Sequence, residues 1–144
     1  MRVDVGQQDV MQDWFEWYCA QHFRSKQWAQ YRDRFLCPCC YMPTLRERAC
    51  FDICPVCIWE DDGQDSDDAA VVRCGPNGDY SLEEARKNFA AIRTMYRPSS
   101  HAEVCEEPER RAMRSALYDA FTQAIQSGSE SDWIRAQKAL QERG

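Results

Sequence analysis

The sequence lacks long hydrophobic runs and is poor in histidine. No apolar stretch approaches the roughly 18 residues that cross a bilayer, and residues 1–9 contain no apolar core of a secretion signal. His22 and His101 are the only histidines, and no Gly-x-Ser-x-Gly, His-Glu-x-x-His or glycine-rich phosphate loop occurs. These absences predict a cytoplasmic, non-membrane protein that is not an enzyme.

Positive charge is also scarce. The chain has 18 basic and 24 acidic residues, a formal net charge of −6, and no basic stripe. A field of this sign repels phosphate backbones, so we expect no nucleic-acid partner. The acidity is concentrated in residues 60–68, where six carboxylates occur in nine residues without a cation.

What the chain does have is material for a core, with 44% hydrophobic and 12% aromatic residues in 144. We expect one compact α+β globule that is mostly helical. Composition separates an aromatic-rich helical extension at 1–36, a cysteine-rich unit at 37–98 and a helical extension at 99–144. The first extension is predicted to hold two helices, or one bent helix, from two aromatic sets at helical spacing: Trp14, Trp17 and Tyr18, then Trp28, Tyr31 and Phe35.

Start and stop signals predict three further helices. Ser81 and Glu84 form a capping-box pattern ahead of a helix that should end near Tyr96. Pro108 and Gly128 bracket the second helix, and Ser129 with Asp132 begins the third. The apolar residues expected to face inward include Ile92, Met113 and Ile134.

Nine cysteines are present, an odd number, and they cluster. In a reducing compartment this pattern indicates metal binding rather than disulfides. Two pairs, each with sulfurs three positions apart, give the spacing C-x2-C-x13-C-x2-C. Two such turns supply four thiolates to the tetrahedron that zinc prefers, and four protein ligands leave no open position. We therefore predict one structural zinc, held by Cys37, Cys40, Cys54 and Cys57.

Two questions about this site stay open. Iron in a rubredoxin-like cage is the alternative to zinc. Iron is disfavoured because a bulky residue follows each turn, Tyr41 in the first and Ile58 in the second. Rubredoxins resemble one another in carrying glycine at these positions. Cys39 and Cys50 fall outside the two-turn register, and we interpret them as packed side chains or free thiols, with a ligand role for Cys50 as the alternative.

The acidic run allows three interpretations: a solvated loop, a docking patch for a basic protein, or a weak divalent-cation loop. Six like charges in nine residues repel one another, and a cationic partner would relieve that repulsion. In the docking interpretation an aromatic anchor joins the carboxylates, and the partner-binding residues are Trp59, Glu60, Asp61, Asp62, Asp65, Asp67 and Asp68.

Several of these motifs occur together over Cys37–Phe89: Cys-Pro-Cys-Cys, Ile-Cys-Pro-Val-Cys-Ile-Trp-Glu-Asp-Asp-Gly, Gly-Pro-Asn-Gly and Ser-Leu-Glu-Glu-Ala-Arg. The span resembles the bacterial cysteine-rich CPCC domain family. The resemblance implies a small zinc-ribbon-like unit that runs into a helix, and a bacterial or phage source, but no definite activity. With the acidity, it favours an immunity-type inhibitor that neutralises a toxin domain. The alternative is a zinc-ribbon adaptor in nucleic-acid or transcription machinery.

Overall fold

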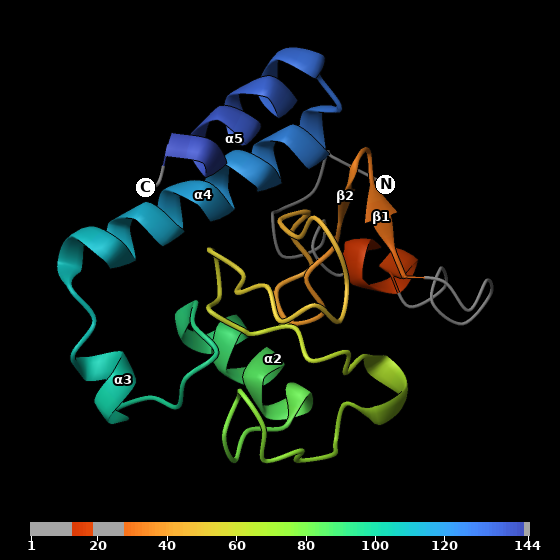
Figure 1. The fold of residues 1–144 in the computed structure, drawn as a ribbon. Helices are drawn as coiled ribbons and strands as arrows, with labels where there is room; N and C mark the ends of the chain where they lie inside the picture. Colours follow the sequence, from red (N-terminus) through yellow and green to blue (C-terminus); the bar gives the residue numbers. More distant parts are fainter. Residues whose placement is uncertain (1–12, 19–27, 143–144) are drawn as a thin grey trace.

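The computed structural model describes residues 13–18 and 28–142 (Figure 1). Residues 13–18 are helical. The elements that follow are β1 (Gln30–Tyr31), β2 (Arg34–Phe35), the 3-10 helix η1 (Ser66–Asp68), α2 (Leu82–Ile92), α3 (His101–Val104), α4 (Pro108–Ser127) and α5 (Glu130–Glu142). The fold is therefore α+β and mostly helical, as predicted, with long irregular segments between β2 and α2.

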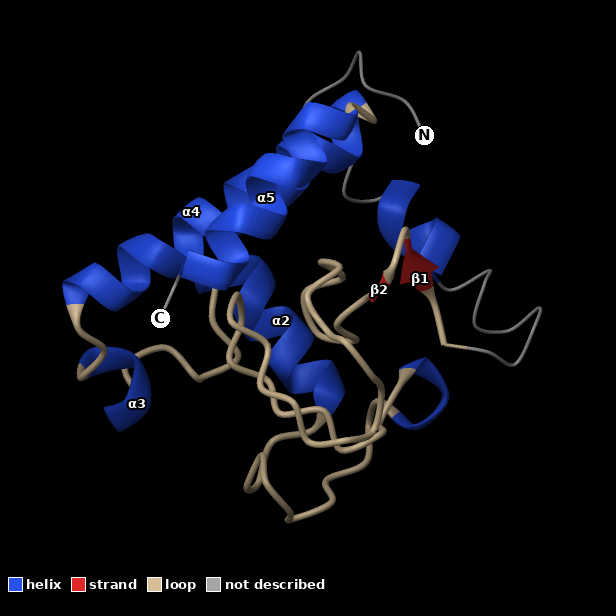
Figure 2. Ribbon diagram, turned by 45° about the horizontal axis from the view of Figure 1, so that its top comes forward, coloured by secondary structure: helices blue, strands red, loops and turns tan. Residues whose placement is uncertain are grey.

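The C-terminal helices form an antiparallel hairpin along one side of the molecule (Figure 2). Pro108 occupies the first turn of α4, and Gly128 ends the helix at φ 66°, a left-handed conformation that glycine adopts without strain. The Ser129 hydroxyl accepts a hydrogen bond from the Asp132 backbone N–H at the start of α5. The predicted boundaries are confirmed because each depends on local capping chemistry.

Helix α2 begins where the sequence predicts and ends sooner. The Ser81 hydroxyl accepts from the Glu84 N–H, which caps the first turn. The helix ends at Ile92, because Arg93 turns into the left-handed region at φ 64°. The predicted end near Tyr96 is therefore wrong. After that turn the Met95 carbonyl accepts a hydrogen bond from the Asn88 side chain of α2, and the Met95 N–H donates to the Cys57 carbonyl.

The predicted second aromatic helix is wrong. Tyr31 and Phe35 lie in the two strands of a small antiparallel hairpin, with Tyr31 opposite Arg34. Phe35 also exchanges backbone hydrogen bonds with Leu45, so the strand continues into the first cysteine turn. Strand pairing fixes the chain on both sides of the turn. It therefore overrides the helix that the spacing of the aromatic residues indicates.

Buried side chains from residues 13–18, the cysteine-rich unit and helices α2, α4 and α5 form a single hydrophobic core. Three apolar residues expected to face inward are exposed instead: Ile92 at 37%, Met113 at 42% and Ile134 at 56%. Among the described residues, no helix combines the length and apolar character needed to cross a membrane. In Figure 1 the irregular cysteine segments lie between the α4–α5 hairpin and α2.

Candidate metal centre

Each cysteine pair lies in the turn of a short hairpin. Phe35 and Leu45 exchange backbone hydrogen bonds of 2.9 and 3.2 Å beneath the first turn. Beneath the second turn, the Asp61 N–H donates to the Asp52 carbonyl at 2.9 Å. Two hairpins that present cysteine turns to each other match the zinc-ribbon-like unit that the sequence resemblance implies.

The two turns have the same internal hydrogen bonds. In the first, the Cys37 N–H donates to the Met42 carbonyl and the Tyr41 N–H donates to the Cys37 carbonyl. In the second, the Cys54 N–H donates to Trp59 and the Ile58 N–H donates to Cys54 in the same way. The repeated pattern means that the sequence motif Cys-x-x-Cys encodes one local structure twice.

The residues after the two turns adopt an unusual backbone conformation. Tyr41 has φ 65° and Ile58 has φ 77°, in the left-handed region that glycine favours. Both turns therefore accommodate a bulky residue at a position where glycine is the unstrained choice. Turn geometry does not distinguish zinc from iron at this site.

The four predicted ligands meet in the core. Their sulfur atoms all lie within 4.8 Å of one another, and no side chain of the set is more than 3% exposed. The Cys37 and Cys57 sulfurs are 3.5 Å apart, and those of Cys40 and Cys54 are 3.6 Å apart. A tetrahedral zinc with sulfurs at about 2.3 Å would place them about 3.8 Å apart. The donor set and its spacing therefore fit a metal ion of this kind.

The two cysteines whose role was open lie outside this cluster. Cys39 is buried, and its backbone N–H donates to the Cys37 sulfur at 3.4 Å. Cys50 is exposed, and its thiol donates to Glu47. Cys39 is thus a packed neighbour of the site, whereas Cys50 is a surface thiol. The alternative ligand role of Cys50 is not supported by the described geometry.

Polar groups around the cluster point toward the sulfurs. The N–H groups of Val56 and Trp59 lie 3.4 Å from the Cys54 and Cys57 sulfurs, respectively. The Thr44 hydroxyl lies 3.1 Å from the Cys54 sulfur. Such donors stabilise thiolates, which are the form of cysteine that binds metal.

Burial opposes that ionisation. It raises the pKa of the thiols of Cys37, Cys40 and Cys57 well above the ordinary value. Burial acts the same way on Cys54, but hydrogen bonds from the other thiols and from Thr44 outweigh it and lower that pKa. A bound dication would convert all four to thiolates and release protons.

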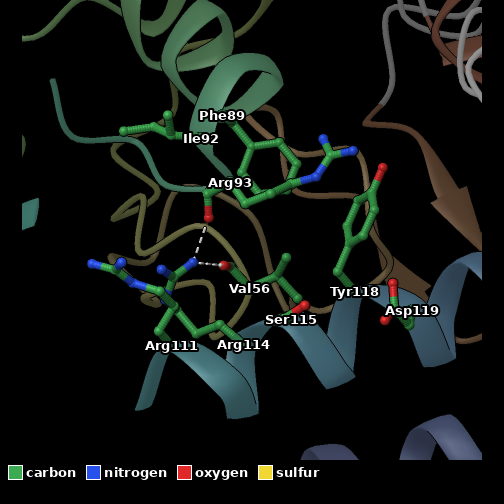
Figure 3. A pocket seen from close by; sticks show the side chains of 9 residues that line it. All are labelled: Val56, Phe89, Ile92, Arg93, Arg111, Arg114, Ser115, Tyr118 and Asp119. Atoms are coloured by element: carbon green, nitrogen blue, oxygen red, sulfur yellow. Dashed lines mark hydrogen bonds between the residues drawn. The ribbon is translucent and has the colours of Figure 1, made fainter. Parts of the chain in front are cut away.

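Arginines from two helices hold the cysteine turns in place. Arg86 of α2 donates to the Pro38 carbonyl in the first turn at 2.8 Å. Arg114 of α4 donates to the Val56 carbonyl in the second turn at 2.8 Å and to the Arg93 carbonyl (Figure 3). Glu106 accepts two hydrogen bonds of 2.6 Å from Arg114, so the buried guanidinium is neutralised. No local sequence pattern indicates these contacts, which join residues 48 and 58 positions apart.

The acidic run is folded around a buried arginine, which the sequence analysis missed. Arg48 donates to Asp61 at 2.8 Å and to Asp65 at 2.9 Å, and all three side chains are at most 2% exposed. The Tyr18 hydroxyl also donates to Asp65, at 2.7 and 2.8 Å to its two oxygens. Burial alone would raise the pKa of Asp65, but Arg48 and Tyr18 outweigh it and lower the pKa. Asp61 and Asp65 therefore belong to the core.

The other members of the predicted docking patch also differ from expectation. Trp59 is completely buried, so it is not a surface anchor. The Asp62 side chain is 6% exposed and lies 3.7 Å from Arg73, which pairs with Asp68 at 2.6 Å. The run contains no cation of its own, and two arginines outside it, Arg48 and Arg73, neutralise much of its charge. The carboxylates that remain at least partly exposed are those of Glu60, Asp67 and Asp68.

The fold and the cluster define a helical protein built around a four-cysteine centre. A family model described as cysteine-rich CPCC matches residues 35–112, more than half of the chain. The chain belongs to the cysteine-rich CPCC family. The match extends the resemblance seen over Cys37–Phe89 through α3 into the first turn of α4. No curated protein and no solved structure matches the chain.

We predict that Asp61→Asn destabilises the protein by about 3 kcal/mol or more, because it leaves the buried Arg48 charge without one of its carboxylates. Asp61 also accepts from the N–H groups of Ala49 and Gly63, which an amide satisfies less well. Urea unfolding monitored by tryptophan fluorescence measures the change.

Asp67→Asn is the matched control, since Asp67 is an exposed carboxylate of the same loop. It should change the free energy of unfolding by less than about 0.5 kcal/mol. Equal stability of the two variants would contradict the role of Asp61 in the buried network.

Proposed function

We propose that the four cysteines bind one zinc ion and that this zinc is structural. The observation that carries the proposal is the convergence of four buried sulfurs at tetrahedral spacing. Four cysteine ligands complete the coordination of zinc, so neither water nor substrate has a position on the ion. The binding free energy then stabilises the fold, because the unfolded chain has no preformed site.

Protein purified without added metal should contain about one zinc per chain by elemental analysis. Cys37→Ser and Cys54→Ser should each abolish stoichiometric zinc and lower the thermal midpoint. Cys50→Ser is the control and should retain zinc, because its thiol lies on the surface outside the cluster. The flanking helices α4 and α5 should retain helical circular dichroism after chelation.

The same measurement separates zinc from iron. A red protein that shows charge-transfer absorption in the visible range and contains one iron per chain would mean that the site binds iron, as in the rubredoxin-like alternative, and not zinc. Absence of any metal, or zinc content unchanged in Cys37→Ser and Cys54→Ser, would contradict the metal site itself. A catalytic activity proportional to metal content would contradict a structural role.

We further propose that the protein acts by binding another protein, as an immunity-type inhibitor of a toxin domain. A closed metal site supports this, since it provides rigidity rather than reactivity. The formal charge of −6 supports a basic partner, because complementary charge accelerates association. The exposed part of the acidic run, Glu60, Asp67 and Asp68, is the section of the predicted patch that a partner could contact.

A double variant tests this surface without disturbing the core. Glu60→Gln and Asp67→Asn together should leave zinc content unchanged while slowing association with a basic toxin domain and weakening its salt dependence. Asp68 is left unchanged, because its carboxylate accepts a hydrogen bond from the Asp65 N–H and pairs with Arg73. Surface plasmon resonance with a basic toxin domain that co-purifies with the wild-type protein measures the association rate at several salt concentrations. Asp61 and Asp65 are excluded from the variant, because their loss would unfold the loop. If the variant associates with the toxin domain as fast as the wild type and protects cells from it equally well, the loop has no binding role.

A further inference from the structure

The second cysteine hairpin carries an apolar surface that the described residues, 13–18 and 28–142, leave open. Two adjoining hollows of about 540 and 350 Å³ share Ile53 and Pro55 in their walls. The first hollow also includes Phe51, and the second includes Ile58 of the hairpin and Met113 of α4. We call these residues the hairpin patch: Phe51, Ile53, Pro55, Ile58 and Met113.

Large apolar side chains of the hairpin patch are open to solvent. Phe51 is 57% exposed, Ile53 is 54% exposed and Met113 is 42% exposed. Single exposed apolar residues are ordinary on protein surfaces, but three lining connected hollows form a contiguous surface. Contiguous apolar surfaces of this kind mark interaction sites.

Phe51 adds a second, independent observation. Its backbone has φ 63°, in the left-handed region that is unfavourable for an aromatic residue. Burial of the ring does not offset this strain, because more than half of the side chain is exposed. Glycine would satisfy the same backbone without strain. The Phe51 N–H is held by the Asp61 carbonyl, while more than half of the side chain is available for a contact outside the chain.

The charges around the hairpin patch are opposite in sign to the chain as a whole. Arg34 and Arg46 line the first hollow, and Arg110 lines the second. Among the described residues Asp52 is the only carboxylate in either lining, and Arg46 and Arg110 form no ion pair. Arg110 and Arg46 are both exposed. An arginine rim around an apolar centre is typical of a protein-binding surface.

We propose that the hairpin patch binds a segment of a partner protein that presents apolar side chains flanked by carboxylates. The apolar side chains occupy the hollows at Ile53 and Pro55, and the carboxylates pair with Arg46 and Arg110. The proposal concerns a surface distinct from the acidic run and does not depend on the nature of the toxin-binding residues. The site lies directly beside Cys54, so the metal that we propose for the cluster would hold its hairpin rigid.

Fluorescence anisotropy with the zinc-loaded full chain tests the proposal. The probe is a short labelled peptide in which leucines alternate with glutamates, and its matched partner carries lysines in place of the glutamates. The glutamate peptide should bind and the lysine peptide should bind at least tenfold more weakly. Arg46→Glu with Arg110→Glu should reverse this preference, whereas the control Lys87→Glu, an exposed cation of α2, should not.

Phe51→Gly separates binding from stability. It should keep or raise the thermal midpoint, because glycine relieves the left-handed strain, and yet weaken peptide binding about tenfold by removing the aromatic contact. Ile53→Ala should also weaken binding, whereas Val104→Ala, a change at an exposed apolar residue of α3, should not. If the role of Phe51 were purely structural, Phe51→Gly would lower the thermal midpoint and leave peptide binding unchanged.

Three results would overturn the proposal. The first is equal affinity for the glutamate and lysine peptides. The second is binding that is unaffected by Phe51→Gly and Ile53→Ala. The third is no binding of either peptide while zinc content and stability are intact. Loss of zinc in the wild type would instead contradict the proposed metal site, so the two failures are distinguishable.

Discussion

The convergence of four cysteine sulfurs inside the core is the constraint on which the rest of the structure depends. Sulfurs within 4.8 Å of one another require both hairpin turns to face inward at the same place. The segments that lead into these turns then have little freedom, and they contain few regular elements of their own. The hydrogen bonds of Arg86 and Arg114 to the turn carbonyls make the helices part of the same constraint.

A second consequence concerns the acidic run that follows the second turn. Once Cys57 is fixed, residues 61–65 lie against the segment that carries Arg48, and the carboxylates enter the core. Buried charges are tolerated only when they are paired and hydrogen-bonded, and Asp61 meets that condition through Arg48, Ala49 and Gly63. The acidity of this run therefore contributes to folding as well as to the net charge.

Internal neutralisation changes where binding surfaces are expected. With Arg48 and Arg73 engaged by the acidic run, the cations that remain without ion pairs in the described chain include Arg46 and Arg110. They lie beside exposed Phe51, Ile53 and Met113. Net charge describes the long-range field that guides association, whereas local charge at an apolar surface governs which segment binds. In this protein the net charge is negative, whereas the local charge around the hairpin patch is positive.

The sequence by itself determined what local chemistry controls. The Cys-x-x-Cys spacing predicted the four sulfurs of the cluster, and Ser81, Pro108 and Gly128 marked helix ends, because these signals act within a turn or two of the chain. It did not reveal that Trp59 and Asp61 are buried, that Tyr31 and Phe35 are in strands, or that Phe51 is exposed. Those outcomes depend on contacts between distant residues, such as Arg48 with Asp61 and Phe35 with Leu45. Only the tertiary structure decides which charges meet, because ion pairing and burial depend on proximity in space and not on spacing along the chain.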